Sequence, residues 1–99
     1  YHEDAVLEYP QSGERTRGRR NIQNQRASQP NKKRFTIRRI IGGDDLWITE
    51  LILTYDGKAT CTVSIMEFRG AKVALETQYF ADPFPASAWR AQWVERMDT

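Results

Sequence analysis

The sequence contains few of the residues from which disulfides and metal centres are built. Its 99 residues include a single cysteine, Cys61, and a single histidine, His2. One cysteine cannot form an intrachain disulfide, and these two residues cannot provide a cysteine-based or multi-histidine metal site. We therefore expect a chain without a metal ion or a cofactor, and a cytoplasmic setting as the default.

Long apolar runs are also missing. No run approaches the roughly 18 apolar residues that cross a bilayer, and no secretory signal opens the chain. The length predicts one domain, residues 1–99, with a single modest core. Because the sequence begins "YHEDAVLEY" without an initiator methionine, truncation at the N-terminus is kept as a hypothesis.

Positive charge is concentrated in one part of the chain. Between Gln11 and Arg39 there are ten lysine or arginine residues and one acid, Glu14, although the net charge of the whole chain is only +2. Such a segment can bind nucleic acid or another anion. Phe35 is its only aromatic residue, however, so it lacks the interleaved stacking residues of a single-strand binder. We favour a solvated surface over a nucleic-acid partner, and keep an anionic partner of segment 15–39 as an alternative.

The alternation of apolar and polar residues predicts an α+β domain. Residues 4–10 are typical of a short strand, residues 11–18 of a polar loop, and residues 18–30 of a short helix that ends before Pro30. Turn signals separate four further strands, and "DG" is the strongest of these signals. The four strands cover residues 35–41, 46–55, 58–68 and 73–80. We expect them to form an antiparallel meander, with the first strand added at its edge.

A terminal helix is predicted over residues 87–97. Trp89, Trp93 and Met97 recur at four-residue spacing, and Ser87 is a suitable N-cap. A stripe of this kind is typical of a buried helix face, so we expect these three side chains to lie in the core.

A two-residue turn at Asp56-Gly57 fixes which strand residues share a face. Trp47, Thr49, Leu51 and Leu53 then lie on one face with Thr60, Thr62, Ser64 and Met66. The opposite face carries Ile48, Glu50, Ile52, Cys61, Val63 and Ile65. Both faces are apolar, whereas an antiparallel sheet usually leaves one face polar. We therefore expect a homodimer that forms through the second face.

The segments "HEDAVLEYP", "RGRRNI" and "SIMEFRGAKVALETQYFADPF" resemble the SnoaL-like branch of the nuclear transport factor 2-like superfamily. The resemblance implies a cone, in which a strongly bent antiparallel sheet wraps around helices and an apolar pocket. The family's one or two helices before the first strand are absent from this sequence. The superfamily contains isomerases, cyclases, epoxide hydrolases, dehydratases and binding proteins, so the site must be argued from its own residues.

The resemblance also shows which catalytic carboxyls are unmatched. Tyr9 stands where similarity to the ketosteroid isomerases places an aspartate base, and Ser64 where it places a protonated aspartate. Gln78 stands where the limonene-type epoxide hydrolases carry an aspartate. Asp82 is the candidate nearest to the acid/base aspartate of the polyketide cyclases. The chemistries of the first two groups are therefore not expected here.

Two carboxyls remain as candidate acids or bases. Asp82 precedes a proline, where a carboxylate commonly accepts hydrogen bonds from turn amides, and we prefer this structural interpretation to a catalytic one. Glu76 alternates with Gln78 and Phe80 on one face of the last strand. If that face lines the pocket, which requires a bulge or a three-residue turn at "RGA", Glu76 must be paired there.

The sequence thus predicts a pocket for a small hydrophobic molecule. Its polar contacts and walls would come from Tyr9, Trp47, Ser64, Met66, Phe68, Gln78 and Phe80. An acid/base enzyme of the cyclase, isomerase or dehydratase type, using Asp82 or Glu76, is the alternative.

Overall fold

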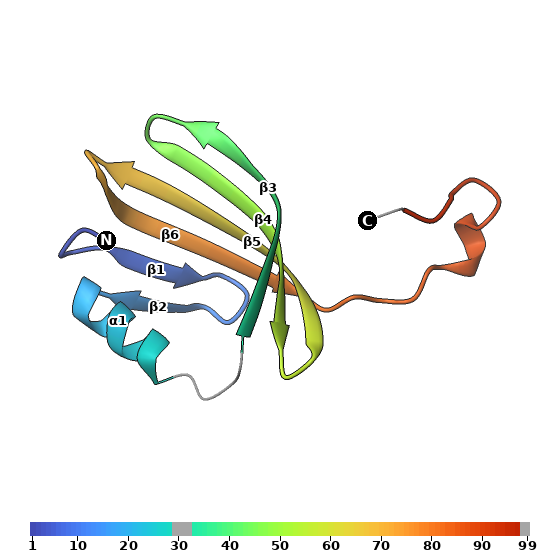
Figure 1. The fold of residues 1–99 in the computed structure, drawn as a ribbon, viewed down its shortest axis with the longest axis horizontal. Helices are drawn as coiled ribbons and strands as arrows, with labels where there is room; N and C mark the ends of the chain where they lie inside the picture. Colours follow the sequence, from blue (N-terminus) through green and yellow to red (C-terminus); the bar gives the residue numbers. More distant parts are fainter. Residues whose placement is uncertain (29–32, 98–99) are drawn as a thin grey trace.

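The computed structural model describes residues 1–28 and 33–97, which form one bent sheet and one α-helix (Figure 1). In chain order the elements are β1 (Val6–Tyr9), β2 (Glu14–Arg17), α1 (Arg19–Ala27), β3 (Lys33–Gly43), β4 (Leu46–Tyr55), β5 (Lys58–Arg69), β6 (Lys72–Ala81) and a 3₁₀ turn, η1 (Ala88–Arg90). The α+β class and the strongly curved antiparallel sheet are confirmed. Pro30, the expected end of the helix, lies outside the described residues; α1 itself ends at Ala27.

The six strands lie in the order β2-β1-β6-β5-β4-β3. Strands β3 to β6 form the predicted antiparallel meander. The segment expected as a polar loop instead supplies β2, because it turns at Gly13 and pairs back onto β1. As predicted, β1 is added at the edge of the meander, where it runs parallel to β6, and β2 lies outside it as the edge strand of the whole sheet.

The Asp56-Gly57 turn sets the faces of the sheet as predicted. Both residues have positive φ, and the flanking Tyr55 and Lys58 pair directly, which is the geometry of a two-residue hairpin. Trp47 is therefore opposite Met66 and Leu51 opposite Thr62. We call the face that carries these residues the concave face, because α1 packs on the same side of the sheet, and the opposite one the convex face.

A bulge in β6 brings Glu76 onto the concave face. The β5–β6 turn has only two residues, since Arg69 pairs with Lys72, but the register shifts so that Glu67 pairs with Leu75 and Phe68 with Val73. Ala74 is the extra residue. The shift turns the side chains of the residues that follow in β6 to the other face of the sheet. Glu76, Gln78 and Phe80 therefore lie on the concave face, where they pair with Met66, Ser64 and Thr62 of β5.

The buried core lies where α1 covers β1. Ala5, Leu7 and Ile22 are fully buried there, and Tyr1 and Tyr9 pack against them. Ile22 is the single buried residue of α1, a nine-residue helix that would be marginal without this contact. None of the described helices is long and apolar enough to cross a membrane.

The prediction of a terminal helix is wrong. Only the short 3₁₀ turn η1 forms in that region, and Ser87 makes no capping hydrogen bond. Trp89, Trp93 and Met97 are 75%, 72% and 67% exposed rather than buried. The segment leaves the sheet after β6 and extends away from it (Figure 1). Without a surface to pack against, a short amphipathic segment has little to stabilise its helix.

The close approach of two backbones at Gly42 gives a test of the β3–β4 hairpin. A Cβ atom at Gly42, whose φ is +153°, would lie 2.1 Å from the carbonyl oxygen of Leu46. We expect Gly42→Ala to lower the free energy of unfolding by about 1–3 kcal/mol, measured by urea denaturation. Gly43→Ala is the matched control, because nothing lies within 4 Å of its added carbon. Equal stability of the two variants would contradict this account of the hairpin.

Candidate functional site

Glu76 is a buried carboxylate at the centre of the concave face. It is 1% exposed, and four side chains donate hydrogen bonds to it. Oε1 accepts from the Tyr1 hydroxyl and from Nη2 of Arg26 at 3.1 Å. Oε2 accepts from Oγ of Ser64 at 2.6 Å and from Nε2 of Gln78 at 3.0 Å. Each carboxylate oxygen is therefore satisfied twice, which offsets the cost of burying a charge.

These four donors come from parts of the chain that are distant in sequence. Ser64 and Gln78 are direct cross-strand partners on β5 and β6. Arg26 belongs to the last turn of α1, and Tyr1 precedes β1. Nη2 of Arg26 also donates to the Tyr1 hydroxyl at 2.8 Å. Burial, together with the hydrogen bond to Glu76, raises the pKa of Tyr1, so this hydroxyl is a neutral donor at physiological pH.

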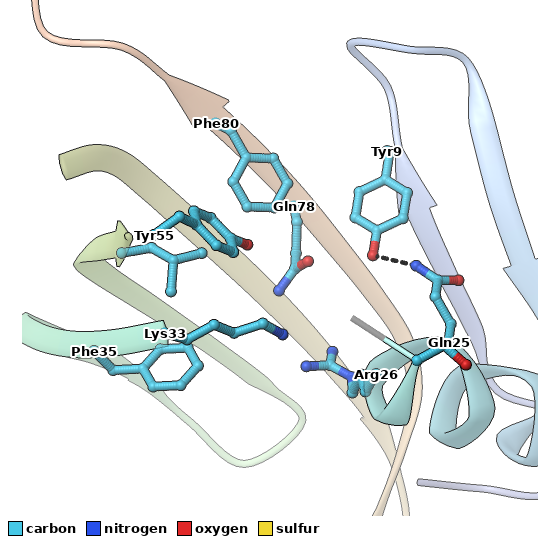
Figure 2. Close-up of a pocket in the computed structure, with 10 residues that line it drawn as sticks. Tyr9, Gln25, Arg26, Lys33, Phe35, Tyr55, Gln78 and Phe80 are labelled. Carbon is cyan, nitrogen blue, oxygen red and sulfur yellow. Dashed lines mark hydrogen bonds between the residues drawn. The ribbon is translucent and has the colours of Figure 1, made fainter. Parts of the chain in front are cut away.

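Next to this network is a cavity of about 430 Å³, which we call the concave cavity (Figure 2). Its walls come from β1, α1, β3, β4 and β6, and from the residue that follows α1. The lining residues are Tyr9, Gln25, Arg26, Ser28, Lys33, Phe35, Leu53, Tyr55, Gln78 and Phe80. Its size lies within the usual range of small-molecule sites, and its lining combines aromatic walls with a few polar groups.

A second hollow of about 230 Å³, the adjoining cavity, continues along the concave face. It shares Arg26, Phe35, Leu53 and Gln78 with the concave cavity. Its own lining adds Ile37, Thr49, Leu51, Thr62, Ser64, Met66 and Glu76. Phe35 and Ile37 are 60% and 57% exposed, so the apolar side of both hollows is open on the β3 side.

Tyr9 is held in place at the wall of the concave cavity. Nε2 of Gln25 donates to its hydroxyl oxygen at 2.9 Å (Figure 2), and the Thr16 hydroxyl donates to Oε1 of the same Gln25. Its ring lies 6.0 Å from that of Phe80, centroid to centroid. Burial raises the pKa of Tyr9 above its ordinary value, which keeps the phenol protonated.

Most of the residues predicted for the site meet on the concave face. Tyr9, Gln78 and Phe80 line the concave cavity, and Ser64, Met66, Glu76 and Gln78 line the adjoining one. Trp47 and Phe68 line neither, because they lie toward the end of the hairpins that is distant from α1.

Asp82, the other candidate acid, lies outside both cavities. It is exposed and follows the end of β6. Among the described residues it makes no side-chain hydrogen bond, so it neither caps a helix nor faces a pocket. The expected link from strand to helix is absent because the terminal helix does not form.

Sequence patterns did not predict that basic side chains line the concave cavity. Arg26 and Lys33 were treated as part of a solvated basic segment, yet both line the cavity. Phe35 and Tyr55 were also missed, although Tyr55 follows Leu53 by two residues and so shares its face. The contribution of Lys33 depends on the curvature that brings the start of β3 toward α1 (Figure 2), and strand patterns do not encode this.

The solved structures that match this chain support the fold described above. No protein-family model and no curated protein matches the chain. Among solved structures, an NTF-2-like protein of unknown function from Burkholderia xenovorans LB400 is 54% identical, with a TM-score of 0.91; the match covers 98% of this chain and 77% of that one. A proposed ketosteroid isomerase from Kribbella flavida is 23% identical, with a TM-score of 0.88, and the match covers 98% and 72%. An NTF2-like protein of unknown function from Cytophaga hutchinsonii is 10% identical, with a TM-score of 0.62 and coverage of 80% and 67%.

The hydrogen-bond network predicts how the protein responds to loss of the Glu76 charge. Glu76→Gln replaces one oxygen by an NH₂ group, which then faces donors instead of accepting from them. We expect the free energy of unfolding to fall by about 2–3 kcal/mol, measured by urea denaturation. Glu67→Gln on β5 is the matched control, because Glu67 is exposed, and it should change stability by less than about 0.5 kcal/mol. A Glu76→Gln protein as stable as this control would refute the role of the network.

Proposed function

This chain belongs to the nuclear transport factor 2-like family, and from this premise we propose that its concave face binds a small hydrophobic molecule. The observation that carries the proposal is the concave cavity, in which side chains from five elements face one space of about 430 Å³ (Figure 2). Aromatic and aliphatic side chains form its walls, and Tyr9 and Gln78 supply neutral hydrogen-bonding groups. The motifs around Tyr9 and in the β5–β6 hairpin support a place in the SnoaL-like branch.

The geometry favours binding over acid/base catalysis. A general acid or base must exchange a proton with its ligand. Both oxygens of Glu76 are already occupied by protein donors, and Asp82 is exposed outside the cavities. The enzyme alternative is supported by one observation, that Glu76 lines the adjoining cavity, and it requires the ligand to displace a donor from that carboxylate.

The alternative anionic partner of segment 15–39 has less support. The segment is divided between β2 and α1 at one edge of the sheet and β3 at the other. Arg38 and Arg39 both pair with Glu50, and Arg15 and Arg19 lie within 4.0 Å of glutamates. The described residues of the segment, 15–28 and 33–39, therefore present no single basic patch of the kind that nucleic acid requires. The exposed thiol of Cys61 is compatible with the proposed cytoplasmic setting.

A neutral two-ring probe tests the proposed binding site. We expect 2-naphthamide to bind the wild-type chain in isothermal titration calorimetry, and Phe35→Ala to weaken the affinity about tenfold because it removes an aromatic wall. Phe35 is 60% exposed, so the substitution should leave the fold intact. Ile41→Ala is the control: Ile41 is on the same strand, 49% exposed, and pairs with Ile48 on the convex face. No binding, or an equal loss in both variants, would argue against the proposal.

The proposed function includes a homodimer that forms through the convex face. Ile48, Ile52, Val63, Ile65 and Leu75 are only partly covered there, and Tyr79 is 43% exposed. A second copy of the chain offers the same apolar surface, which a two-fold interface requires.

Sedimentation velocity tests the dimer. At micromolar concentration we expect a species of twice the 11.5 kDa chain mass. Val63→Asp should shift it to the monomer, because a buried unpaired carboxylate opposes association. Ala71→Asp, in the exposed β5–β6 turn, should remain dimeric. A monomeric wild-type chain would rule the dimer out.

A further inference from the structure

The lining of the concave cavity carries positive charge, which binding of a purely apolar ligand would not require. Two cationic side chains line it, Arg26 from the last turn of α1 and Lys33 from the start of β3. None of its ten lining residues is a carboxylate. Figure 2 shows the ends of the two cationic side chains directed toward each other across the same space, near the amide of Gln78. Two cations that face each other repel unless an anion lies between them.

The charged side chains around the cavity indicate how many negative charges a matching anion would carry. Arg26 forms an ion pair with Glu76 at 3.1 Å, and the two charges offset each other. Lys33 then leaves the site with a net charge of one positive unit. Burial, with the positive charge of Arg26 as a further cause, lowers the pKa of Lys33, and a bound anion would oppose this shift. A ligand with a single negative charge complements the site, whereas a dianion would exceed it.

Hydrogen-bond donors are available at the same place. Within the described residues, Arg26 uses only Nη2 to reach Glu76 and Tyr1, although a guanidinium has five N–H donors. Its side chain is 41% exposed, so the remaining donors can reach a ligand. The Tyr9 hydroxyl oxygen accepts from Gln25, so its own O–H group can donate to a ligand. These neutral and charged donors suit the two oxygens of a carboxylate.

The apolar part of the ligand is defined by the opposite wall. The rings of Phe35, Tyr55 and Phe80 face the same space (Figure 2), and Leu53 lines it as well. Aromatic rings at such a wall favour a flat, apolar body over a flexible polar one.

We propose that the concave cavity binds a small aromatic monocarboxylate, with its carboxylate between Lys33 and Arg26 and its ring system against Phe35 and Phe80. This inference rests on the proposed function, since it names the chemical class of the ligand for the same cavity. It differs from a purely hydrophobic ligand in one measurable way: the negative charge must contribute to affinity.

A pair of matched probes separates the two claims. 2-Naphthoate and 2-naphthamide have the same rings and nearly the same shape, and only the first carries a charge. In isothermal titration calorimetry we expect the wild-type chain to bind 2-naphthoate about tenfold or more tightly than 2-naphthamide. Lys33→Met keeps the length of the side chain and removes the charge. It should abolish this preference, and a circular dichroism spectrum that matches the wild-type one shows that the variant is folded.

Lys58→Met is the matched control, because Lys58 is exposed at the β4–β5 turn and lines neither cavity. It should keep the full preference for 2-naphthoate. Equal affinity of the wild-type chain for the two probes would overturn the carboxylate inference and leave the proposed binding function standing. Binding of neither probe would overturn both. An equal loss in Lys58→Met and Lys33→Met would also overturn the inference, because it would trace the preference to overall charge.

Discussion

The fold depends on one buried charge and on the donors that satisfy it. A carboxylate that is 1% exposed would be costly to bury alone, so the chain must bring polar partners to Glu76 when it folds. Those partners come from the segment before β1, from α1, from β5 and from β6. Apart from this network, the described residues attach α1 through Ile22, the Thr16–Gln25–Tyr9 hydrogen bonds, a hydrogen bond from Asn21 to the backbone of β2, and the contacts of Gly18 and Arg19 with the segment before β1. The carboxylate therefore fastens the end of the helix to the centre of the concave face.

The same interaction shapes the concave face, for which we propose a ligand. Holding Arg26 against Glu76 fixes the position of the last turn of α1, and this turn forms one wall of the concave cavity with Gln25 and Arg26. The bent sheet supplies the opposite wall and brings Lys33 toward the helix end. A structural role and the proposed recognition role thus meet in one residue: Arg26 neutralises a buried carboxylate with one nitrogen and also lines the cavity. Such an arrangement supports selective binding more readily than proton transfer.

Local patterns predicted the sheet well and the chain ends poorly. The Asp56-Gly57 turn and the alternation in β4 and β5 determine which residues face the cavity, because both are set by short-range backbone geometry. The need for a bulge or a three-residue turn near the β5–β6 turn followed from the family resemblance, which placed the Glu76 face of β6 at the pocket, and the bulge is present. The role of Arg26 could not be predicted, since its partner lies fifty residues away on another element. The Trp89 and Trp93 stripe misled because periodicity reports the potential for a helix, and only a packing surface makes that helix stable.

Amide hydrogen exchange tests most directly whether Glu76 fastens α1 to the sheet. In a Glu76→Gln variant kept under native conditions, this account predicts that the amides of residues 22–26 in α1 lose about tenfold or more of their protection, while those of the central strands β4 and β5 keep theirs. Such a pattern would identify the helix as a unit that the carboxylate holds closed. Wild-type protection of α1 in that variant would contradict the account, because contacts other than Glu76 would then be enough to hold the helix.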